Sequence, residues 1–358
     1  MKHRVGRIQE KLQAKGIDAI VIGSPENRRY LSGFTGTSGI VLITLTEGLL
    51  LTDFRYVEQA KEQAPHLKVV RHGQELLEEM AQIFKELNIS TVAIEEEYVT
   101  YEQYVKYRDE LGVTLEPVKG WVEDLRLIKD QDEVDKLKQA VKLADDAFNH
   151  IIKYLEIGKD EMEISLELEF YMRRNGASGV AFDTIIASGQ RGALPHGVAS
   201  KKKLQKGDLV VMDYGAVFQG YHSDMTRTVA MAEINDKQKE IYNIVLEAQQ
   251  TAVDAIKPGM TGIEVDAAAR KVIAEKGYAD YFGHGLGHGV GLAVHEGPRL
   301  SPNANVELQP GMAITVEPGI SEQVLALVTG ELRRMETSNN AWQGAYSSMK
   351  VVDGDTSE

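Results

Sequence analysis

An acidic residue stands inside a stretch of chain that otherwise has the composition of a buried β-strand. The stretch LVVMDYG runs from Leu209 to Gly215 and places Asp213 among apolar neighbours. Because an isolated carboxylate is very costly to bury, Asp213 must be paired, hydrogen-bonded or bound to a metal. Strand alternation puts it on the same face as Val211. This one residue therefore restricts the chain to folds that bring a partner to the strand.

A second aspartate, Asp224, follows in the segment YHSDMTRT, where another strand is expected to begin. A hairpin that pairs residues 213–218 with residues 224–230 would bring the two aspartates close together. The alternative is a turn aspartate and a strand-end aspartate that are held only by hydrogen bonds. Both interpretations stay open on these two residues alone.

Composition narrows the classes of partner that the chain can have. Its 358 residues, 43 % of them hydrophobic, are enough for two domains with a sizeable core. The net charge of −14 argues against nucleic acid, because phosphate binding needs a concentrated basic surface. The chain has no cysteine, which excludes disulfides, zinc–thiolate sites and thiol nucleophiles. Since no apolar signal core or membrane-spanning run is found, we expect a soluble cytoplasmic protein that binds no membrane.

Apolar periodicity divides the chain into two parts. Residues 1–125 alternate short apolar strands, such as DAIVIG, with amphipathic helices, which is typical of an α/β domain. A polar joint at residues 120–133 separates this part from a second one that begins near residue 132. The second part combines paired helices with strands in antiparallel-looking groups. The helices are expected at residues 132–155, 165–176, 235–256 and 261–277. We therefore predict an α/β (α+β) fold of two domains.

Three of the nine histidines lie among glycines in YFGHGLGHGVGLAVHEGP, residues 281–298. They are His284, His288 and His295. Neutral imidazole is a common metal ligand, and small neighbours let other backbone segments crowd the site. The G-x-G-x-x-G nucleotide fingerprint fails at its last glycine, and the HExxH zinc pattern fails because Gly-Pro-Arg follows His295 and its glutamate. A metal or substrate site is favoured over three structural histidines.

Two further residues extend the set of candidates. Glu317 ends the apolar run ITVEPGI, and His196 lies in the glycine- and proline-containing loop ALPHGVAS. Together with the two aspartates they form an oxygen-rich donor set, which suits Mn²⁺, Co²⁺ or Fe²⁺ better than a thiolate-preferring metal. Two acidic bridges would suit a pair of ions.

In these contexts the chain resembles the pita-bread metallopeptidases, and most closely the Xaa-Pro dipeptidases (prolidases) and aminopeptidase P. The resemblance covers roughly residues 1–320 and rests on four motifs in a fixed order. The motifs are AFDTIIASGQRGALPHGVAS, DYGAVFQGYHSDMTRT, HGLGHGVGLAVHEGP and GMAITVEPGI. It implies an N-terminal creatinase-like α/β domain over residues 1–125, followed by a pita-bread catalytic domain over residues 132–320.

The resemblance also implies a centre of two divalent metal ions, usually Mn²⁺ or Co²⁺. Asp213 would bind one ion and Asp224 would bridge both. His288 and Glu317 would bind the other ion. Through a water activated by the two ions, such an enzyme hydrolyses the Xaa-Pro bond in dipeptides or at peptide N-termini. Its partners would be a proline-containing peptide and a second copy of the chain in a homodimer.

Catalytic roles follow from the same resemblance. His196, His284 and His295 fall where the family has substrate-contacting or supporting histidines. His284 or His295 would stabilise the tetrahedral oxyanion. Glu317 would carry the proton to the leaving proline nitrogen.

The end of the chain departs from the family pattern. After the EPGI motif the family has a Gly-rich strand pair with Arg-x-Glu-Asp, whose glutamate is the second bridging ligand. Residues 321–358 lack this pattern, and Glu331 is the only positional candidate for that ligand. Thr329 stands where arginine is expected and Leu332 where aspartate is expected. We therefore expect an atypical tail that forms an incomplete end of the catalytic domain, and a weakly bound second ion.

Three alternatives remain at this point. A methionine aminopeptidase is disfavoured by the complete N-terminal domain, and a creatinase-like amidinohydrolase lacks the ligand set found here. A catalytically impaired family member, which acts as a peptide- or partner-binding protein because the last ligand motif is missing, belongs to a different class. Metal analysis together with an X-Pro hydrolysis assay would separate these alternatives.

Overall fold

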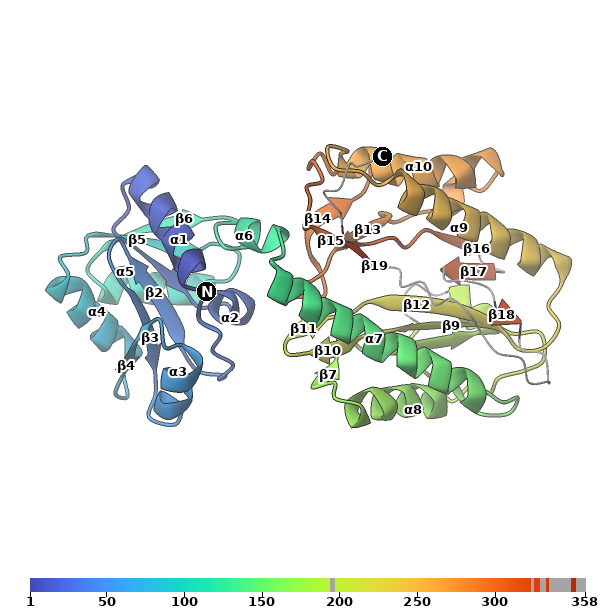
Figure 1. Cartoon of the computed structure of the whole chain (residues 1–358), viewed down its shortest axis with the longest axis horizontal. Coiled ribbons are helices and arrows are strands. Elements are labelled where there is room, and N and C mark those ends of the chain that lie inside the picture. The colour runs from blue at the N-terminus through green and yellow to red at the C-terminus, as the bar shows by residue number, and fades with distance from the viewer. Residues whose placement is uncertain (194–196, 323–324, 329–332, 335–348, 352–358) are drawn as a thin grey trace. The chain divides into compact units, whose positions relative to one another are not determined.

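The computed structural model divides the chain into two units, Met1–Arg126 and Leu127–Glu358 (Figure 1). Each unit combines helices with β-sheet. No helix in the described part of the chain is long and apolar enough to cross a membrane. The residues that the structure describes are 1–193, 197–322, 325–328, 333–334 and 349–351.

The first unit is built on a six-stranded sheet with the order β4-β3-β2-β1-β5-β6. Its strands are β1 Ala19–Ile22, β2 Ile40–Thr44, β3 Gly48–Thr52, β4 Lys68–Arg71, β5 Thr91–Glu95 and β6 Thr114–Val118. Its helices are α1 Lys2–Lys15, α2 Pro25–Ser32, α3 Val57–Gln63, α4 Leu76–Glu86, α5 Tyr101–Glu110 and α6 Glu123–Leu127. Alternate β1 side chains, Ala19 and Val21, share a core with α4. The intervening Ile20 and Ile22 point to the other face, so the sheet is covered on both sides.

The second unit contains two four-stranded sheets, with the orders β18-β12-β9-β8 and β14-β13-β15-β19. The strands of the first are β8 Ile185–Ser188, β9 Leu209–Tyr214, β12 Met225–Ala230 and β18 Arg333–Arg334. Those of the second are β13 Gly287–Gly289, β14 Glu296–Leu300, β15 Ala313–Thr315 and β19 Met349–Val351. A three-stranded sheet contains β7 Gly179–Val180, β10 Ala216–Phe218 and β11 Tyr221–His222. A two-stranded sheet contains β16 Gly319–Glu322 and β17 Leu325–Val328.

Helices cover the two sheets from opposite sides. They are α7 Gln131–Tyr154, α8 Glu161–Arg174, α9 Asp236–Ala255 and α10 Gly262–Glu275, with short 3-10 helices η1 Gly189–Ala193 and η2 Ala279–Tyr281. Helices α7 and α8 share a core with β8, β9 and β12, whereas α9 and α10 share a core with β13, β14 and β15. Figure 1 shows the two helix pairs on the outer sides of this unit, with the strands between them.

Helix α8 begins at Glu161, four residues before the start expected from its apolar pattern. The reason is a capping box, in which Asp160 accepts a hydrogen bond from the Glu163 amide and the Glu163 carboxylate accepts one from the Asp160 amide. This extension places Glu161 in the first helical turn with a fully buried side chain.

The strand predicted around Asp213 is divided at Gly215. Before this glycine, β9 pairs antiparallel with β12 and Asp213 lies opposite Thr226. After it, β10 pairs with β11 in a different sheet. A Cβ atom at Gly215 would lie 1.9 Å from the carbonyl oxygen of Ser223, so the close approach requires glycine. The predicted hairpin was therefore wrong in its extent: only the first residues of its first strand pair with β12.

Part of the predicted atypical tail is described, and it forms short strands. Strand β17 pairs with β16, β18 joins β12, and β19 joins β15. Glu331 lies outside the described residues, so its predicted role as a ligand stays a prediction.

We expect Gly215→Ala to destabilise the second unit by about 1–3 kcal/mol, because the added methyl group must displace backbone around Ser223. Gly283→Ala is the matched control, since nothing lies within 4 Å of the Cβ atom that it adds. Urea unfolding of both metal-free variants measures the difference. A Gly215→Ala variant as stable as the control would contradict the close packing at this turn.

Candidate metal centre

Four polar side chains from separate strands meet on the sides of the two sheets that the helices leave uncovered. Asp213 lies in β9, Asp224 immediately before β12, His288 in β13, and Glu317 two residues after β15. The Nε2 atom of His288 lies 3.4 Å from Oδ2 of Asp224 and 3.5 Å from Oε1 of Glu317. Both carboxylates also act on the pKa of Asp213. The structure thus brings together the four residues for which the resemblance implies metal ligands.

Glycines on both sides of His288 let β13 fit between its neighbours. A Cβ atom at Gly287 would lie 2.1 Å from the carbonyl oxygen of Thr315, and one at Gly289 would lie 1.8 Å from that of Gly297. Only glycine therefore permits these strand contacts at either position. The alternation of glycine and histidine in the sequence is explained by packing as well as by chemistry.

Hydrogen bonds fix the orientation of the His288 ring. Its Nδ1 donates to the carbonyl oxygen of Gly289 at 3.0 Å, which leaves Nε2 facing the carboxylates. Its backbone amide donates to Oγ1 of Thr315 at 3.1 Å. A backbone carbonyl that holds one ring nitrogen commonly sets the tautomer in which the other nitrogen binds a metal. His288 is therefore oriented as a metal ligand.

The three carboxylates, of which Asp224 is buried and Asp213 and Glu317 are partly buried, repel one another. Burial, and then the charges of Asp224 and Glu317, raise the pKa of Asp213 well above its usual value. Burial and the Asp224 charge raise the pKa of Glu317 to about 7. Burial alone would lower the pKa of His288, but its hydrogen bond to Asp224 and the charge of Glu317 raise it overall. The contributions of neighbouring charges to these three pKa shifts come from an excess of negative charge, which a cation would neutralise.

The donor atoms fit a divalent metal ion. Oδ1 of Asp213 and Oε1 of Glu317 are buried and accept no hydrogen bond from any described residue. A buried acceptor without a partner is costly, and a bound cation would supply the partner for both oxygens. Three carboxylates and one imidazole form the oxygen-rich set that Mn²⁺, Co²⁺ and Fe²⁺ accept.

His295 lies at the solvent side of this centre. Ligand atoms of Asp224, His288 and His295 all lie within 4.8 Å of one another. The His295 ring meets the His288 ring edge-on, with centroids 4.3 Å apart. His295 is exposed, and partial burial together with the His288 charge lowers its pKa, which favours a neutral imidazole near pH 7. A neutral ring beside the ligands can donate a hydrogen bond to a substrate.

The other two predicted histidines differ from His295. His284 is exposed, its ring packs edge-on against Phe282 at 5.0 Å, and its Nδ1 donates to the carbonyl oxygen of Gly285 at 2.8 Å. These contacts hold it within its own loop. His196 lies outside the described residues. The catalytic roles of both residues stay predictions.

Two threonines that support the cluster were missed in the sequence. Thr226 lies opposite Asp213 across the ladder, and its hydroxyl acts to lower the pKa of that carboxyl against the larger effect of burial. The Thr315 hydroxyl accepts the His288 amide at 3.1 Å and lies 3.3 Å from the His288 carbonyl oxygen, to which it donates. Strand alternation could have indicated Thr315, because it shares a strand face with Glu317.

Comparison with known proteins gives a consistent result over both units. Residues 135–341 match metallopeptidase family M24, and residues 4–128 match the creatinase/prolidase N-terminal domain. The chain is 41 % identical to the Xaa-Pro dipeptidase of Pyrococcus furiosus over 343 residues, which cover 95 % of this chain and 97 % of that protein. The M24 match extends past residue 320 into the segment that was predicted to be an atypical tail.

Solved structures agree with these matches. The fold resembles the Xaa-Pro dipeptidase from Bacillus anthracis, with a TM-score of 0.90 and 44 % identity over 93 % of this chain and 99 % of that one. It also resembles the X-Pro aminopeptidase from Thermotoga maritima, with a TM-score of 0.83 and 40 % identity over 87 % of this chain and 91 % of that one. The predicted fold class, with an N-terminal creatinase-type domain and a pita-bread catalytic domain, is confirmed.

We expect His288→Ala and His295→Ala to have different effects. Loss of the buried His288 ring should lower the bound metal measured by elemental analysis after dialysis, because this imidazole faces two carboxylates. Loss of the exposed His295 ring should leave metal content near the wild-type level and reduce turnover, by about 10²–10³-fold for one oxyanion donor. Equal loss of metal in both variants would place His295 among the ligands instead.

The raised pKa of Glu317 gives a pH prediction for the metal-free protein. Its folded pKa of about 7 lies above the ordinary value near 4.3, so the folded state binds more protons between these pH values. The free energy of unfolding should therefore fall as pH rises from about 5 to 7. Glu317→Gln should lose this part of the slope. Denaturant unfolding at several pH values, with a chelator present, makes the comparison, and identical slopes would contradict the shift.

Proposed function

This chain belongs to metallopeptidase family M24, and we propose that it hydrolyses the Xaa-Pro bond of dipeptides or peptide N-termini with a water that two divalent ions activate. The observation that carries the proposal is the cluster of three carboxylates and one oriented imidazole, in which two buried carboxylate oxygens accept no hydrogen bond from a described residue. The substrate class is supported by the Xaa-Pro dipeptidases of Pyrococcus furiosus and Bacillus anthracis, which this chain resembles over most of its length.

The residues at this site would have two different roles, metal binding and stabilisation of the oxyanion. Asp213, Asp224, His288 and Glu317 would hold the ions. Metal ions in such a site lower the pKa of bound water to near neutrality and polarise the scissile carbonyl. His295, neutral and beside the cluster, would donate a hydrogen bond to the developing oxyanion.

Glu317 would also carry the proton to the proline nitrogen that leaves. A carboxylate beside the scissile bond can accept a proton from the attacking water and pass it to the leaving nitrogen. Its backbone amide donates to the carbonyl oxygen of Leu286 at 2.7 Å, which ties the strand end carrying Glu317 to the segment that leads into β13. The relative position of Glu317 and His288 is thereby fixed by backbone as well as by side chains.

The finer predictions from the resemblance belong to the same proposal. They are that the ions are Mn²⁺ or Co²⁺, that Glu331 is the second bridging ligand, that the second ion is weakly bound, and that the protein is a cytoplasmic homodimer. Metal stoichiometry of the wild-type chain and of Glu331→Gln tests the ligand. The alternative of a catalytically impaired binding protein gains no support from the comparisons.

The test is hydrolysis of Gly-Pro by the purified chain with added Mn²⁺ or Co²⁺, with Pro-Gly and Gly-Ala as control peptides. Asp213→Asn and Asp224→Asn should each lower kcat at least about a hundredfold, because even outer-shell partners of metal ligands cost 10–100-fold. Asp254→Asn, an exposed aspartate on α9, is the matched control. Hydrolysis of Gly-Pro no faster than of the control peptides by metal-loaded protein would refute the proposal.

A further inference from the structure

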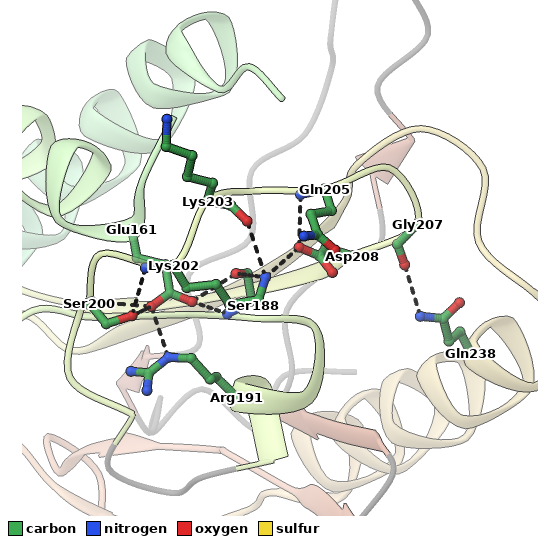
Figure 2. Close-up of polar contacts among 10 residues, drawn as sticks. All are labelled: Glu161, Ser188, Arg191, Ser200, Lys202, Lys203, Gln205, Gly207, Asp208 and Gln238. Carbon is green, nitrogen blue, oxygen red and sulfur yellow. Dashed lines mark hydrogen bonds and ion pairs between the residues drawn. The ribbon is translucent and has the colours of Figure 1, made fainter. Parts of the chain in front are cut away.

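Several buried carboxylates of the second unit lie outside the metal centre, and Glu161 is one of them. Glu161, in the first turn of α8, is fully buried and accepts five hydrogen bonds (Figure 2). All of these donors belong to the segment 188–200, of which the structure describes residues 188–193, the outgoing limb, and 197–200, the returning limb. They are the Ser188 amide at 2.8 Å and hydroxyl at 2.7 Å, Arg191 Nε at 2.9 Å, and the Ser200 amide at 3.1 Å and hydroxyl at 2.6 Å.

The two oxygens of Glu161 divide these donors by position in the chain. Oε1 accepts both hydrogen bonds from Ser188, where the segment begins. Oε2 accepts both from Ser200, where the segment ends, and the one from Arg191. A single side chain therefore holds the outgoing and the returning limb together.

The Glu161 carboxylate is held in its ionised form. Burial alone would raise its pKa, but the hydrogen bonds from Ser200 and Ser188 and the charge of Arg191 lower the pKa below its usual value. Hydrogen bonds to an ionised acceptor are about twice as strong as neutral ones. Five of them on one buried group make a rigid attachment.

A chain of backbone contacts connects this attachment to β9, the strand that carries Asp213. Arg191 donates through Nη2 to the carbonyl oxygen of Val198 at 2.5 Å, so the contact with Glu161 extends into the returning limb. Val198 forms an antiparallel bridge with Ile185, and Ile185 pairs with Asp213 in β9. With neighbouring strands about 4.8 Å apart, the Val198 backbone lies about 10 Å from that of Asp213.

A second set of contacts ties the same segment to the start of β9. Lys202 donates through Nζ to the Ser188 hydroxyl at 2.7 Å and to Oδ2 of Asp208 at 2.6 Å (Figure 2). Asp208 immediately precedes β9 and also accepts the Gln205 amide at 2.9 Å. Lys202 thus connects Ser188, the first residue of the segment, to the residue that precedes the strand of Asp213.

We propose that Glu161 is a positioning residue for the peptidase site: it fixes both limbs of the segment 188–200 against β9, so that the returning limb forms a wall beside the metal centre. Glu161 acts through Ser188, Arg191 and Ser200 and does not touch the substrate. The exposed side chain of Val198 lies on this wall, and His196 precedes it by two residues in the sequence. The inference rests on the proposed function and adds a residue that the ligand set does not contain.

Glu161→Gln is the decisive variant. Its amide oxygen can accept from one limb, but its NH₂ group would face the N–H and O–H donors of the other limb. We expect unchanged metal content, faster amide hydrogen exchange over residues 188–200, and a 10–100-fold lower kcat/KM for Gly-Pro, mostly through KM. Glu169→Gln, on the same helix and with the same change of charge, is the matched control and should match the wild type.

Hydrogen exchange and kcat/KM together decide whether Glu161 is a positioning residue. Faster exchange over residues 188–200 with kcat/KM within twofold of the control would overturn the positioning role, and so would unchanged exchange. If Glu161→Gln loses metal or fails to fold, Ser200→Ala removes one donor of the returning limb and is judged by the same measurements. A wild-type chain that hydrolyses no Xaa-Pro dipeptide would refute the proposed function, whereas the exchange data would still support or overturn the attachment.

Discussion

Mutual repulsion among three carboxylates beside one imidazole is the constraint on which the catalytic unit depends. Burial, and then the repulsion among Asp213, Asp224 and Glu317, raise the pKa values of Asp213 and Glu317, so a cation favours the ionised form of all three. The cost is tolerated because each sheet is stabilised from its other side, by α7 and α8 or by α9 and α10. The inner faces are therefore free to carry chemistry, while the outer faces carry most of the apolar burial.

Much of this arrangement could be predicted from local sequence. An acidic residue in or directly after an apolar strand, such as Asp213 or Glu317, is costly to bury without a partner. The pattern alone therefore indicates a hydrogen-bond, ion-pair or metal partner. Helical periodicity likewise indicated α7, α9 and α10 to within a few residues. The family motifs then supplied the fold class, which the comparisons confirm. The roles of the individual ligands stay predictions, although the structure brings those four side chains together.

What could not be predicted depends on contacts between distant residues. The division of the strand at Gly215 follows from the backbone of Ser223, which no local pattern reports. Glu161 stands in the segment EMEISLELEF, where the sequence predicts that a charged residue occupies an exposed position of the helix. Only the folded chain brings Ser188 and Ser200, twelve residues apart, onto its two oxygens. His284 shows the opposite case, because the ring of a histidine in a suggestive motif makes its described contacts with Phe282 and Gly285 of its own loop.

The candidate ligands come from two different sheets: Asp213 and Asp224 from β9 and the start of β12, His288 and Glu317 from β13 and the end of β15. An ion held by all four would act as a cross-link between the two halves of the catalytic unit. Binding to the folded state alone stabilises it by mass action, so the folded fraction would follow the free metal concentration. A cell short of the metal would then lose this protein through proteolysis of loosened molecules, and metal supply would set its lifetime as well as its activity.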